Sequence, residues 1–373
     1  MADGIEPVVI IGAGPAGIAC AWRLAQLGFS PVILEKESFP RDKVCGDALS
    51  GKVVSLLQKL GGEELVRDLA DQPFAYAACA LDFFDEKGRS VRLSFPPKGN
   101  IPQGFVAPRK EWDAWLASRL PPQVRMWTGV RVRGVELTKR GWEIVGEGMP
   151  PIYARFVVGA DGVTSRVAPW VWRFRGLSRP PVYPAVRAYV AGNSLDGLHL
   201  YFRQPYLPGY FWVFPLRGDK LNVGIGLPDW AVRKRGLSLR QQLRRECSEV
   251  VEVQGHGIPV SLSERPLTGP GCALVGDAAA LTDPFTGEGI GNALLSGIRL
   301  AEALARVSPK DWVQVDWERL YTRPLYRELR RELQMTRLLH RLARFPGVVN
   351  AMIGFLHRYP SWAVPFLRWY GAL

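Results

Sequence analysis

The sequence predicts a mixed fold, in which an α/β domain with a parallel sheet is interleaved with an α+β domain built on antiparallel strands. Three features support this prediction: a strand, turn, helix and strand unit near the amino terminus, two strand-rich stretches farther along, and a helical carboxyl-terminal region. The chain has 373 residues, of which 47% are hydrophobic, and so can bury a large core. We expect domains whose segments alternate along the chain, with the carboxyl-terminal helices after them.

Residues 8–35 form the first unit, VVIIGAGPAGIACAWRLAQLGFSPVILE. Its glycines follow a GxGxxG pattern, which gives a tight turn, lets the backbone approach a pyrophosphate, and packs the helix closely on the sheet. These glycines are Gly12, Gly14 and Gly17. The unit therefore predicts a Rossmann-like domain that binds a dinucleotide.

Both ends of the helix and the end of the second strand fit this unit. Pro15 suits the first helical turn, because the N–H that it lacks would have no partner there. Gly28 can take the left-handed conformation that ends a helix. Glu35 ends the second strand roughly 20 residues beyond the glycines, where its carboxylate can accept a hydrogen bond from a ribose hydroxyl.

The remaining elements alternate between helix-containing and strand-rich segments. We expect a loop and a helix after residue 35, a helix at 109–120, an antiparallel meander at 124–145, buried strands at 152–159 and 272–275, and a long helix at 289–305. In the strand-rich stretches we expect strands at 76–85, 90–95, 185–190, 198–203, 210–215 and 221–225.

Two further motifs follow predicted buried strands. The sequence GADGVTSR places Asp161 in a turn, and the sequence GDAA presents Asp277, which is positioned to bind a polyol hydroxyl. A loop rich in proline and glycine then leads into the helix at 289–305. The free amides and positive dipole end of that helix favour an adjacent negative charge, such as that of a reduced flavin ring.

In this order and spacing, the three motifs resemble those of FAD-dependent reductases and monooxygenases of the p-hydroxybenzoate hydroxylase type, over residues 8–305. The resemblance implies an extended FAD. It implies cofactor contacts at Gly12, Gly14, Pro15, Ala16, Gly17, Glu35, Lys36, Cys45, Gly46, Arg109, Val130, Asp161, Gly276, Asp277, Pro284, Gly287, Gly289 and Ile290. The sequence has no second dinucleotide domain, so a nicotinamide would dock only transiently.

The expected domains follow from these motifs. The FAD-binding domain is discontinuous and comprises residues 1–73, 106–182 and 268–308. The substrate-binding domain, an antiparallel sheet, comprises residues 74–105 and 183–267. A helical region follows at 309–373.

Within that superfamily, two segments are similar to the geranylgeranyl reductase family. The sequence KVCG at 43–46 is similar to the KxCG segment that those enzymes carry near the flavin, and GYFWVFP at 209–215 matches their YxWxFP motif. On a strand, Tyr210, Trp212 and Phe214 share one face, which gives an aromatic wall suited to bind an isoprenoid chain. Packing in the core is the alternative, and the aromatic spacing alone favours it.

Cys45 is the candidate catalytic residue. A thiol beside a flavin can gate the site, donate a proton or only pack, and its spacing does not decide among these roles. Asp47, two residues later, departs from the family pattern, since many relatives have a small residue there.

The net charge of +13 is the outlying feature of the composition. Residues 319–344 hold eight arginines, with leucines at helical spacing, and so predict a basic amphipathic helix. Such a helix can lie on a membrane surface, or it can pack its apolar face on the core and leave its arginines in water. A basic surface can also bind nucleic acid, but the sequence has no nucleic-acid motif.

Several classes of protein are excluded. No apolar run approaches the roughly 20 residues needed to span a bilayer, and the amino terminus lacks a secretory pattern. The five cysteines are scattered, and the four histidines form no metal-ligand pattern, so we expect neither disulfides nor a metal. We expect a cytoplasmic protein, with peripheral contact at the inner face of the membrane through the basic helix.

The leading hypothesis is a flavin reductase that saturates C=C bonds of a prenyl chain in a lipid, quinone or pigment precursor. NAD(P)H or a ferredoxin-like protein would be the external electron donor. A monooxygenase or halogenase of the same fold is one alternative, although Tyr210 and Phe214 differ from the halogenase WxWxIP motif. An electron-transfer flavoprotein that passes electrons to quinone is another.

Overall fold

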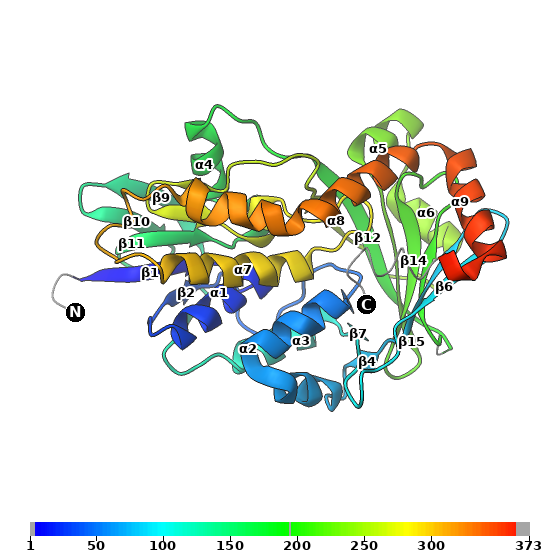
Figure 1. The fold of residues 1–373 in the computed structure, drawn as a ribbon, viewed down its shortest axis with the longest axis horizontal. Helices are drawn as coiled ribbons and strands as arrows, with labels where there is room; N and C mark the ends of the chain where they lie inside the picture. Colours follow the sequence, from blue (N-terminus) through cyan, green and yellow to red (C-terminus); the bar gives the residue numbers. More distant parts are fainter. Residues whose placement is uncertain (1–3, 194, 363–373) are drawn as a thin grey trace.

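The structure is a computed structural model that describes residues 4–193 and 195–362. The molecule is extended along one axis, with a large sheet toward each end and long helices running between them (Figure 1). The segments that build each end come from separate parts of the chain, as the colours of the ribbon show.

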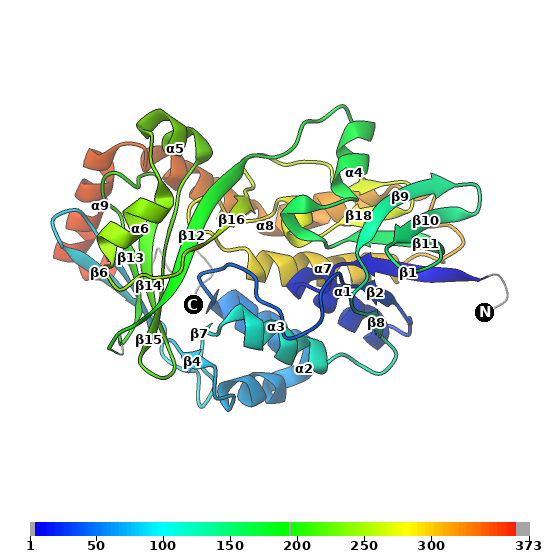
Figure 2. The same ribbon diagram turned by 180° about the vertical axis from the view of Figure 1, so that it is seen from behind.

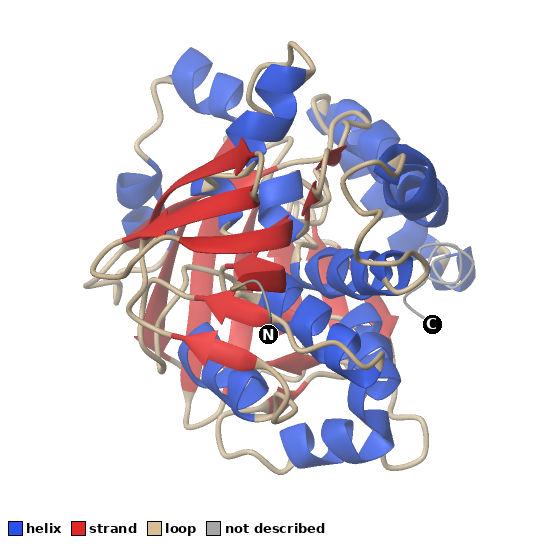
Figure 3. Cartoon of the chain, turned by 90° about the vertical axis from the view of Figure 1, so that its left-hand side faces the viewer, coloured by secondary structure: helices blue, strands red, loops and turns tan. Residues whose placement is uncertain are grey.

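The first sheet has eight strands. They are β1 (Ile5–Ile11), β2 (Val32–Leu34), β8 (Arg125–Trp127), β9 (Val132–Thr138), β10 (Gly141–Gly146), β11 (Ile152–Gly159), β17 (Thr268–Gly269) and β18 (Cys272–Leu274). The central order is β18-β11-β1-β2-β8, and every pairing in it is parallel. Figure 3 shows these strands side by side, with helices packed against them.

The predicted meander at 124–145 is wrong in one respect. Strands β9 and β10 form an antiparallel hairpin, but β8 runs parallel to β2 and extends the first sheet. The Arg125 amide donates to the Pro31 carbonyl and the Glu35 amide to the Trp127 carbonyl, which fixes this register. Short alternating runs reveal a strand but not its partner, so the sequence could not distinguish the two arrangements.

Four helices belong to this end of the molecule. They are α1 (Pro15–Gln26), α2 (Gly51–Ala70), α3 (Arg109–Ser118) and α7 (Ile290–Leu304). Helices α1 and α7 lie so close that a Cβ atom on Gly297 would stand 2.3 Å from the Ala16 carbonyl oxygen. This approach brings the amino-terminal end of α7 to the glycine-rich turn. A shorter helix, α4 (Ala168–Phe174), follows β11.

The second sheet has seven strands in the order β16-β12-β15-β14-β13-β5-β6. They are β5 (Ala80–Phe84), β6 (Ser90–Ser94), β12 (Val182–Ala191), β13 (Leu198–Tyr201), β14 (Tyr210–Leu216), β15 (Lys220–Gly226) and β16 (Gln254–Pro259). Figure 2 shows β12 and β16 on the side of this sheet that faces the parallel sheet. The short helices α5 (Asp229–Arg235) and α6 (Leu239–Glu246) accompany it.

Two expectations for this sheet are wrong in detail. Strands β5 and β13 pair in parallel, so the sheet is not wholly antiparallel. The strand expected at 76–85 is divided, because Tyr76 and Ala77 form β4 of a separate small sheet. That sheet also contains β3 (Ala48–Leu49) and β7 (Phe105–Val106). Its strands occur where the chain passes from one large sheet to the other: β3 and β4 come before β5, and β7 comes after β6.

The carboxyl-terminal region is helical up to the last described residues. A π-helical turn at Glu318–Thr322 leads into α8 (Arg323–Leu342), and α9 (Pro346–Arg358) follows. Helix α8 buries Leu325, Leu329 and Leu333 on the core, which agrees with the predicted amphipathic pattern. Within the described residues, no helix has the length and hydropathy needed to cross a bilayer. Residues 363–373, the end of the predicted helical region, lie outside the described part.

Candidate cofactor and substrate site

The glycine-rich turn combines two closely packed glycines with an open one. A Cβ atom on Gly12 would lie 2.5 Å from the Ala160 carbonyl oxygen, and one on Gly17 would lie 2.0 Å from the Gly12 carbonyl oxygen. A Cβ atom on Gly14 would meet nothing within 4 Å. The outer glycines therefore allow the strand, turn and helix to pack, while the middle one leaves room for a ligand to approach the backbone.

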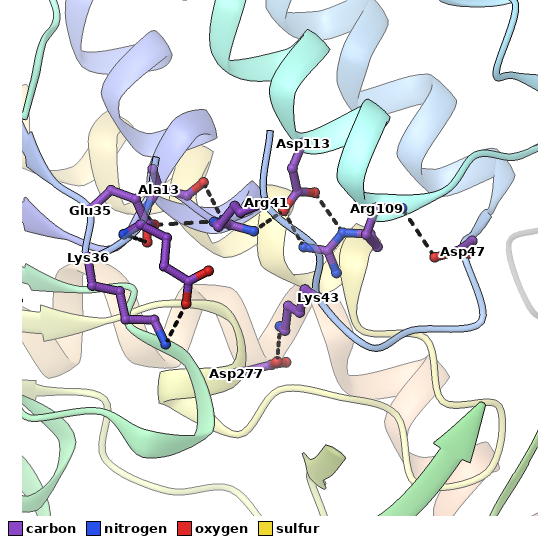
Figure 4. A network of polar contacts seen from close by, with 10 residues as sticks. Ala13, Glu35, Lys36, Arg41, Lys43, Asp47, Arg109, Asp113 and Asp277 are labelled. Carbon is purple, nitrogen blue, oxygen red and sulfur yellow. Dashed lines mark hydrogen bonds and ion pairs between the residues drawn. The ribbon is translucent and has the colours of Figure 1, made fainter. Parts of the chain in front are cut away.

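Glu35 lies at the end of β2 and holds this turn. Its carboxylate accepts hydrogen bonds from the amides of Ala13, at 2.8 Å, and Glu37, at 3.1 Å, as Figure 4 shows in part. Its carbonyl accepts a bond of 2.9 Å from the Val130 amide. Glu35 Oε2, which accepts from Ala13, also lies 3.7 Å from the Arg41 guanidinium. Glu35 Oε1 accepts from Glu37 and has a second lone pair for a ribose hydroxyl. The exposed Lys36 ammonium pairs with Glu37 at 3.3 Å.

A buried charged cluster lies beside the turn, built from two arginines and one aspartate (Figure 4). Arg109 donates two hydrogen bonds to Asp113, at 2.6 and 2.8 Å, and Arg41 donates a third at 2.7 Å. Burial alone would raise the pKa of Asp113, but the two guanidinium groups outweigh it and lower that pKa. Arg41 also lies 3.7 Å from the Glu35 carboxylate, so with Glu35 included the two guanidinium groups are balanced by two carboxylates. What suits an anionic pyrophosphate here is the set of guanidinium N–H donors.

Only Arg109 of this cluster was predicted. Arg41 also donates a bond of 3.0 Å to the Ala13 carbonyl, which ties the cluster directly to the glycine-rich turn. The i, i+4 spacing of Arg109 and Asp113 on one helix was a signal that could have identified their pairing. Nothing comparable in the sequence indicated Arg41.

Asp277 lies at the turn after β18, beside the amino-terminal end of α7. Its carboxylate accepts a hydrogen bond of 2.7 Å from the Lys43 ammonium (Figure 4). Burial opposes ionisation of this carboxyl group, but the Lys43 charge outweighs burial and lowers the pKa of Asp277. A Cβ atom on Gly289 would lie 3.8 Å from Asp277 Oδ1, so the helix end and the carboxylate face the same space.

Two other predicted residues have mainly local contacts. Asp161 accepts a hydrogen bond of 2.6 Å from the Arg166 amide, which closes the turn after β11. Gly276 has a positive φ of 58°, and a Cβ atom there would lie 2.9 Å from the Ala16 Cβ. Asp161 therefore closes its own turn, and Gly276 lets the chain after β18 approach the first turn of α1.

One cavity of about 320 Å³ brings the motifs together. From the cofactor motifs it is lined by Gly14, Pro15, Ala16, Arg109, Asp277, Gly287, Gly289 and Ile290. From the KxCG segment and the aromatic strand it is lined by Cys45, Gly46, Tyr210, Trp212 and Phe214. We call this the main cavity. The other predicted residues do not line it: Gly12, Gly17, Glu35, Lys36, Val130, Asp161, Gly276 and Pro284.

The aromatic wall lies on β14 and faces the KxCG segment. The rings of Tyr210 and Trp212 have centroids 6.2 Å apart, and those of Trp212 and Phe214 are 6.4 Å apart. A Cβ atom on Gly46 would stand 3.1 Å from the Phe214 ring, so the loop touches the wall directly. The Tyr210 hydroxyl donates to the Thr286 carbonyl, which ties the wall to the loop before α7.

A buried polar network that the sequence did not reveal supports the Cys45 loop. Asn222 donates to the Cys45 carbonyl at 2.9 Å and to the Asp47 carboxylate at 2.8 Å, and it accepts a bond of 2.9 Å from the Trp212 indole. Tyr189 donates to Asp47 at 2.6 Å. The network therefore fixes the position of the loop relative to the wall.

Burial controls the ionisation of this loop. It raises the pKa of the Cys45 thiol, so the sulfur retains its proton at neutral pH. It also raises the pKa of Asp47 to about 6, even though the Tyr189 and Asn222 hydrogen bonds oppose the shift. Asp47 has a positive φ of 64°, which a short polar side chain tolerates better than most.

A cluster of potential metal ligands lies elsewhere, on the second sheet. Ligand atoms of Asp82, Asp196 and His199 lie within 4.8 Å of one another, although the sequence gave no such pattern. Arg92 already provides a cation there, since its guanidinium lies 3.7 Å from Asp82 and 3.0 Å from Asp196. The cluster is not part of the main cavity.

The described residues fit an FAD. The open backbone at Gly14 and the guanidinium groups of the cluster suit its pyrophosphate, the Glu35 carboxylate suits a ribose hydroxyl, and the α7 end suits a negatively charged ring. The individual contacts with FAD stay predictions.

Comparison with known proteins agrees with this geometry. An FAD binding domain family matches residues 6–172. The chain is 31% identical over 329 residues to menaquinone reductase of Mycolicibacterium smegmatis, which covers 82% of this chain and 78% of that protein. It is 30% identical over 336 residues to digeranylgeranylglycerophospholipid reductase of Methanosarcina mazei, with coverage of 84% and 79%.

The fold is also similar to a solved structure. A geranylgeranyl bacteriochlorophyll reductase-like protein from Thermoplasma acidophilum superposes with a TM-score of 0.80, at 24% sequence identity. The match covers 94% of this chain and 91% of that one. Both the parallel and the antiparallel sheet regions therefore lie within the shared fold.

Proposed function

The chain belongs to the geranylgeranyl reductase family of FAD-dependent oxidoreductases, and on this premise we propose that it saturates C=C bonds of an isoprenoid chain. The chain would be carried by a lipid, a quinone or a pigment precursor. The observation that carries the proposal is the composition of the main cavity. One end has the cofactor motifs, and the other is lined by apolar side chains such as Leu81, Leu198 and Leu200.

FAD, when bound, supplies hydride transfer between an external donor and the substrate. The residues of the chain bind and orient the alkene. Trp212 and Phe214 offer flat apolar surfaces beside the loop at 286–290. The Trp212 indole is held by its bond to Asn222, and Tyr210 on the same strand is held by its bond to the Thr286 carbonyl. Because few polar groups line this end, water has little to bind there, which protects a reduced cofactor from side reactions.

Saturation of an alkene also needs a proton. The Cys45 thiol lines the main cavity and keeps its proton, since burial raises its pKa. We propose that Cys45 holds the proton that reaches the second alkene carbon. The network through Asn222 and Asp47 would keep the loop at a fixed distance from the aromatic wall.

The function is tested by anaerobic turnover followed by mass spectrometry of the product. The FAD-loaded protein, a chemical reductant and a geranylgeranyl lipid should give a product that has gained one H₂ for each saturated bond. Oxidation of the donor with no change in the lipid would identify an electron-transfer flavoprotein instead. A product that forms only with oxygen and contains it would identify a monooxygenase.

The proton donor is tested by Cys45→Ser and Cys45→Ala in the same assay. We expect Cys45→Ala to slow saturation more than Cys45→Ser, and both variants to retain FAD. Equal rates for wild type and both variants would exclude the thiol as the proton source.

We further propose that the protein contacts the inner face of a membrane through the end of α8 and through α9. We define the α8–α9 surface by its exposed apolar residues, which are Leu338, Leu342, Phe345, Val348, Phe355 and Trp362. Exposed arginines lie among them at Arg341, Arg344 and Arg358. Apolar side chains surrounded by cations favour an interface with anionic lipid. The first part of α8, by contrast, packs one face on the core through Leu325, Leu329 and Leu333.

Co-sedimentation with vesicles tests this contact. Binding to phosphatidylglycerol vesicles should exceed binding to phosphatidylcholine vesicles and should weaken with salt. Phe345→Ser should reduce binding, whereas Val251→Ser, at an exposed apolar residue far along the chain from this surface, should not. Equal loss in both variants would contradict the proposal.

The electron donor is proposed to be NAD(P)H or a ferredoxin-like protein. The net charge of +13 favours an acidic partner over a neutral one. Anaerobic reduction of the bound flavin should be compared with NADH, with NADPH and with a reduced ferredoxin. Failure of all three donors would contradict this proposal without bearing on the substrate.

A further inference from the structure

A second cavity, of about 230 Å³, lies between the second sheet and helices α8 and α9. Among the described residues, every side chain that lines it is aliphatic, aromatic or methionine. Representative residues are Val91 on β6, Ala343 after α8, and Met352 on α9. A space of this size with no polar partners does not hold ordered water well, and it suits a hydrocarbon.

The second cavity adjoins the main cavity. Four residues line both: Phe83, Leu93, Phe285 and Leu339. The separation between the two spaces is therefore about one side chain thick. Phe285 belongs to the loop that leads to α7, so this boundary lies directly beside the predicted flavin region.

The boundary is built from stacked aromatic rings. Phe202 stacks on Phe285, with centroids 5.5 Å apart, and on Phe83, with centroids 5.9 Å apart. Leu339 of α8 touches the same cluster of buried apolar residues. Apolar packing alone holds these side chains in place, so the two spaces are separated by hydrocarbon groups and not by a polar barrier.

The outer wall of the second cavity is formed by α9 and the segments next to it. Leu342 is 38% exposed, Phe355 is 48% exposed and Trp362 is 62% exposed, yet all three also line the cavity. Helix α9 is anchored by two polar contacts to the start of β6 and to the residue before it. Arg89 donates to the Asn350 carbonyl at 2.7 Å, and a His357 ring nitrogen lies 2.7 Å from the Ser90 carbonyl oxygen.

We propose that the second cavity binds the distal part of the prenyl chain while the reacting double bond lies in the main cavity. The aromatic boundary would then divide the substrate, and the volume beyond it would set how many isoprene units the protein accepts. The inference rests on the proposed function for its substrate class. Its evidence is the purely apolar lining, the four shared residues and the position beside the flavin loop.

A matched pair of substitutions on α9 tests the inference. Met352 lines only the second cavity and is half-buried, whereas its neighbour Ala351 is exposed and does not line it. Met352→Trp should fill the cavity, and Ala351→Trp should leave it open. The measurement is the ratio of kcat/KM for a geranylgeranyl substrate to that for a geranyl substrate with the same headgroup.

We expect Met352→Trp to lower this ratio by roughly tenfold or more, since a few lost hydrocarbon contacts change discrimination by that amount. Ala351→Trp should leave the ratio at its wild-type value. Met352→Ala, which enlarges the cavity and keeps the fold, should raise the relative rate for chains longer than geranylgeranyl. Ratios that are the same in all four proteins would overturn the inference, provided that FAD content and thermal midpoint confirm folding.

A binding experiment separates failure of this inference from failure of the proposed function. A geranylgeranyl analogue with a diazirine at its far end is photolysed with the FAD-loaded protein, and labelled peptides are mapped by mass spectrometry. Label on the peptide containing Met352 supports the second cavity even if the wild-type protein saturates no prenyl chain. Label confined to β14 and the loop at 286–290 overturns it. Label at Met352 only after removal of residues 363–373 also overturns it, because the end of the chain would then be the native occupant.

Discussion

The cofactor end and the hydrocarbon end of the main cavity are built by different means. The cofactor end is supported from behind by backbone positions and buried charges that do not all line it: glycines that admit no Cβ atom, and one aspartate shared by two arginines. The hydrocarbon end depends on side-chain surfaces from strands and helices that are distant in sequence. We expect substitutions around the cofactor end to disrupt folding or FAD binding. We expect substitutions at the hydrocarbon end to change substrate specificity in small steps.

The largest effect is expected at the glycine-rich turn. Gly17→Ala would place a Cβ atom 2.0 Å from the Gly12 carbonyl oxygen, and neither backbone can move away without separating the strand from the helix. We expect a loss of more than about 4 kcal/mol of unfolding free energy, or no folded protein. Urea unfolding and expression in soluble form measure this change.

Gly14→Ala is the matched control, because a Cβ atom there meets nothing within 4 Å. It should leave the stability of the FAD-free protein nearly unchanged and weaken FAD binding. Equal destabilisation by both substitutions would contradict the assignment of Gly17 to packing of the turn and of Gly14 to space for the ligand.

The next effect is expected at the buried charge cluster. Asp113→Ala removes the carboxylate that accepts from both Arg109 and Arg41 and leaves Arg41 only the longer ion pair with Glu35. Removal of one member of a buried pair costs about 3–5 kcal/mol. Glu63→Ala is the exposed control. It removes the carboxylate of the i, i+4 pair with Arg67 and should lower the unfolding free energy by less than about 1 kcal/mol. Chemical unfolding measures both variants. Similar losses of unfolding free energy would contradict the claim that burial makes the Asp113 contacts stronger than the exposed pair.

A smaller effect concerns pH and the loop that joins the two ends. The folded-state pKa of Asp47, about 6, lies above its ordinary value of 3.8. Between these values the folded protein binds more protons than the unfolded chain, so the unfolding free energy falls as pH rises from about 4 to about 6. The fall attributable to Asp47 is on the order of 2–3 kcal/mol.

Asp47→Asn should remove this contribution while retaining a residue that tolerates positive φ. Asp219, which has a φ of 50° on an exposed turn, provides the control, and Asp219→Asn should keep the wild-type pH profile. Urea unfolding across this pH range distinguishes them. An unchanged slope in Asp47→Asn would show that the carboxyl group does not titrate in that window.

The smallest effect is expected on the aromatic wall. Tyr210→Phe removes a single hydrogen bond to the Thr286 carbonyl and preserves the ring, so it should cost about 1 kcal/mol. FAD content should be unchanged, and KM for a prenyl substrate should change by only a few-fold. Loss of FAD in this variant would mean that the wall is also part of the cofactor site.

The same contrast explains what the sequence could predict. The cofactor motifs are local: glycine spacing, a strand-ending acid and a helix start lie close together in the sequence, so Glu35, Asp277 and α7 were predicted. Trp212 and its neighbours were predicted because alternation on a strand is also local. The boundary of Phe83, Phe202 and Phe285 was not, because its members come from three distant segments and carry no pattern.

Long-range polar contacts were missed for the same reason. Arg41 lies in a loop without periodicity, and the Asn222 network joins residues more than a hundred positions apart. The parallel pairings of β8 and β5 were also not predictable, since period-two alternation identifies a strand but not its neighbour or direction.

The most direct test of the central claim is whether a prenyl chain takes electrons from the bound flavin without oxygen. The FAD-loaded protein is reduced anaerobically, mixed with a geranylgeranyl substrate, and followed by flavin absorbance in a stopped-flow instrument. We predict that the oxidised flavin spectrum returns as the chain is saturated, and that a fully saturated chain has no effect. A flavin that stays reduced with the unsaturated chain, and reoxidises only when oxygen is admitted, would contradict the account.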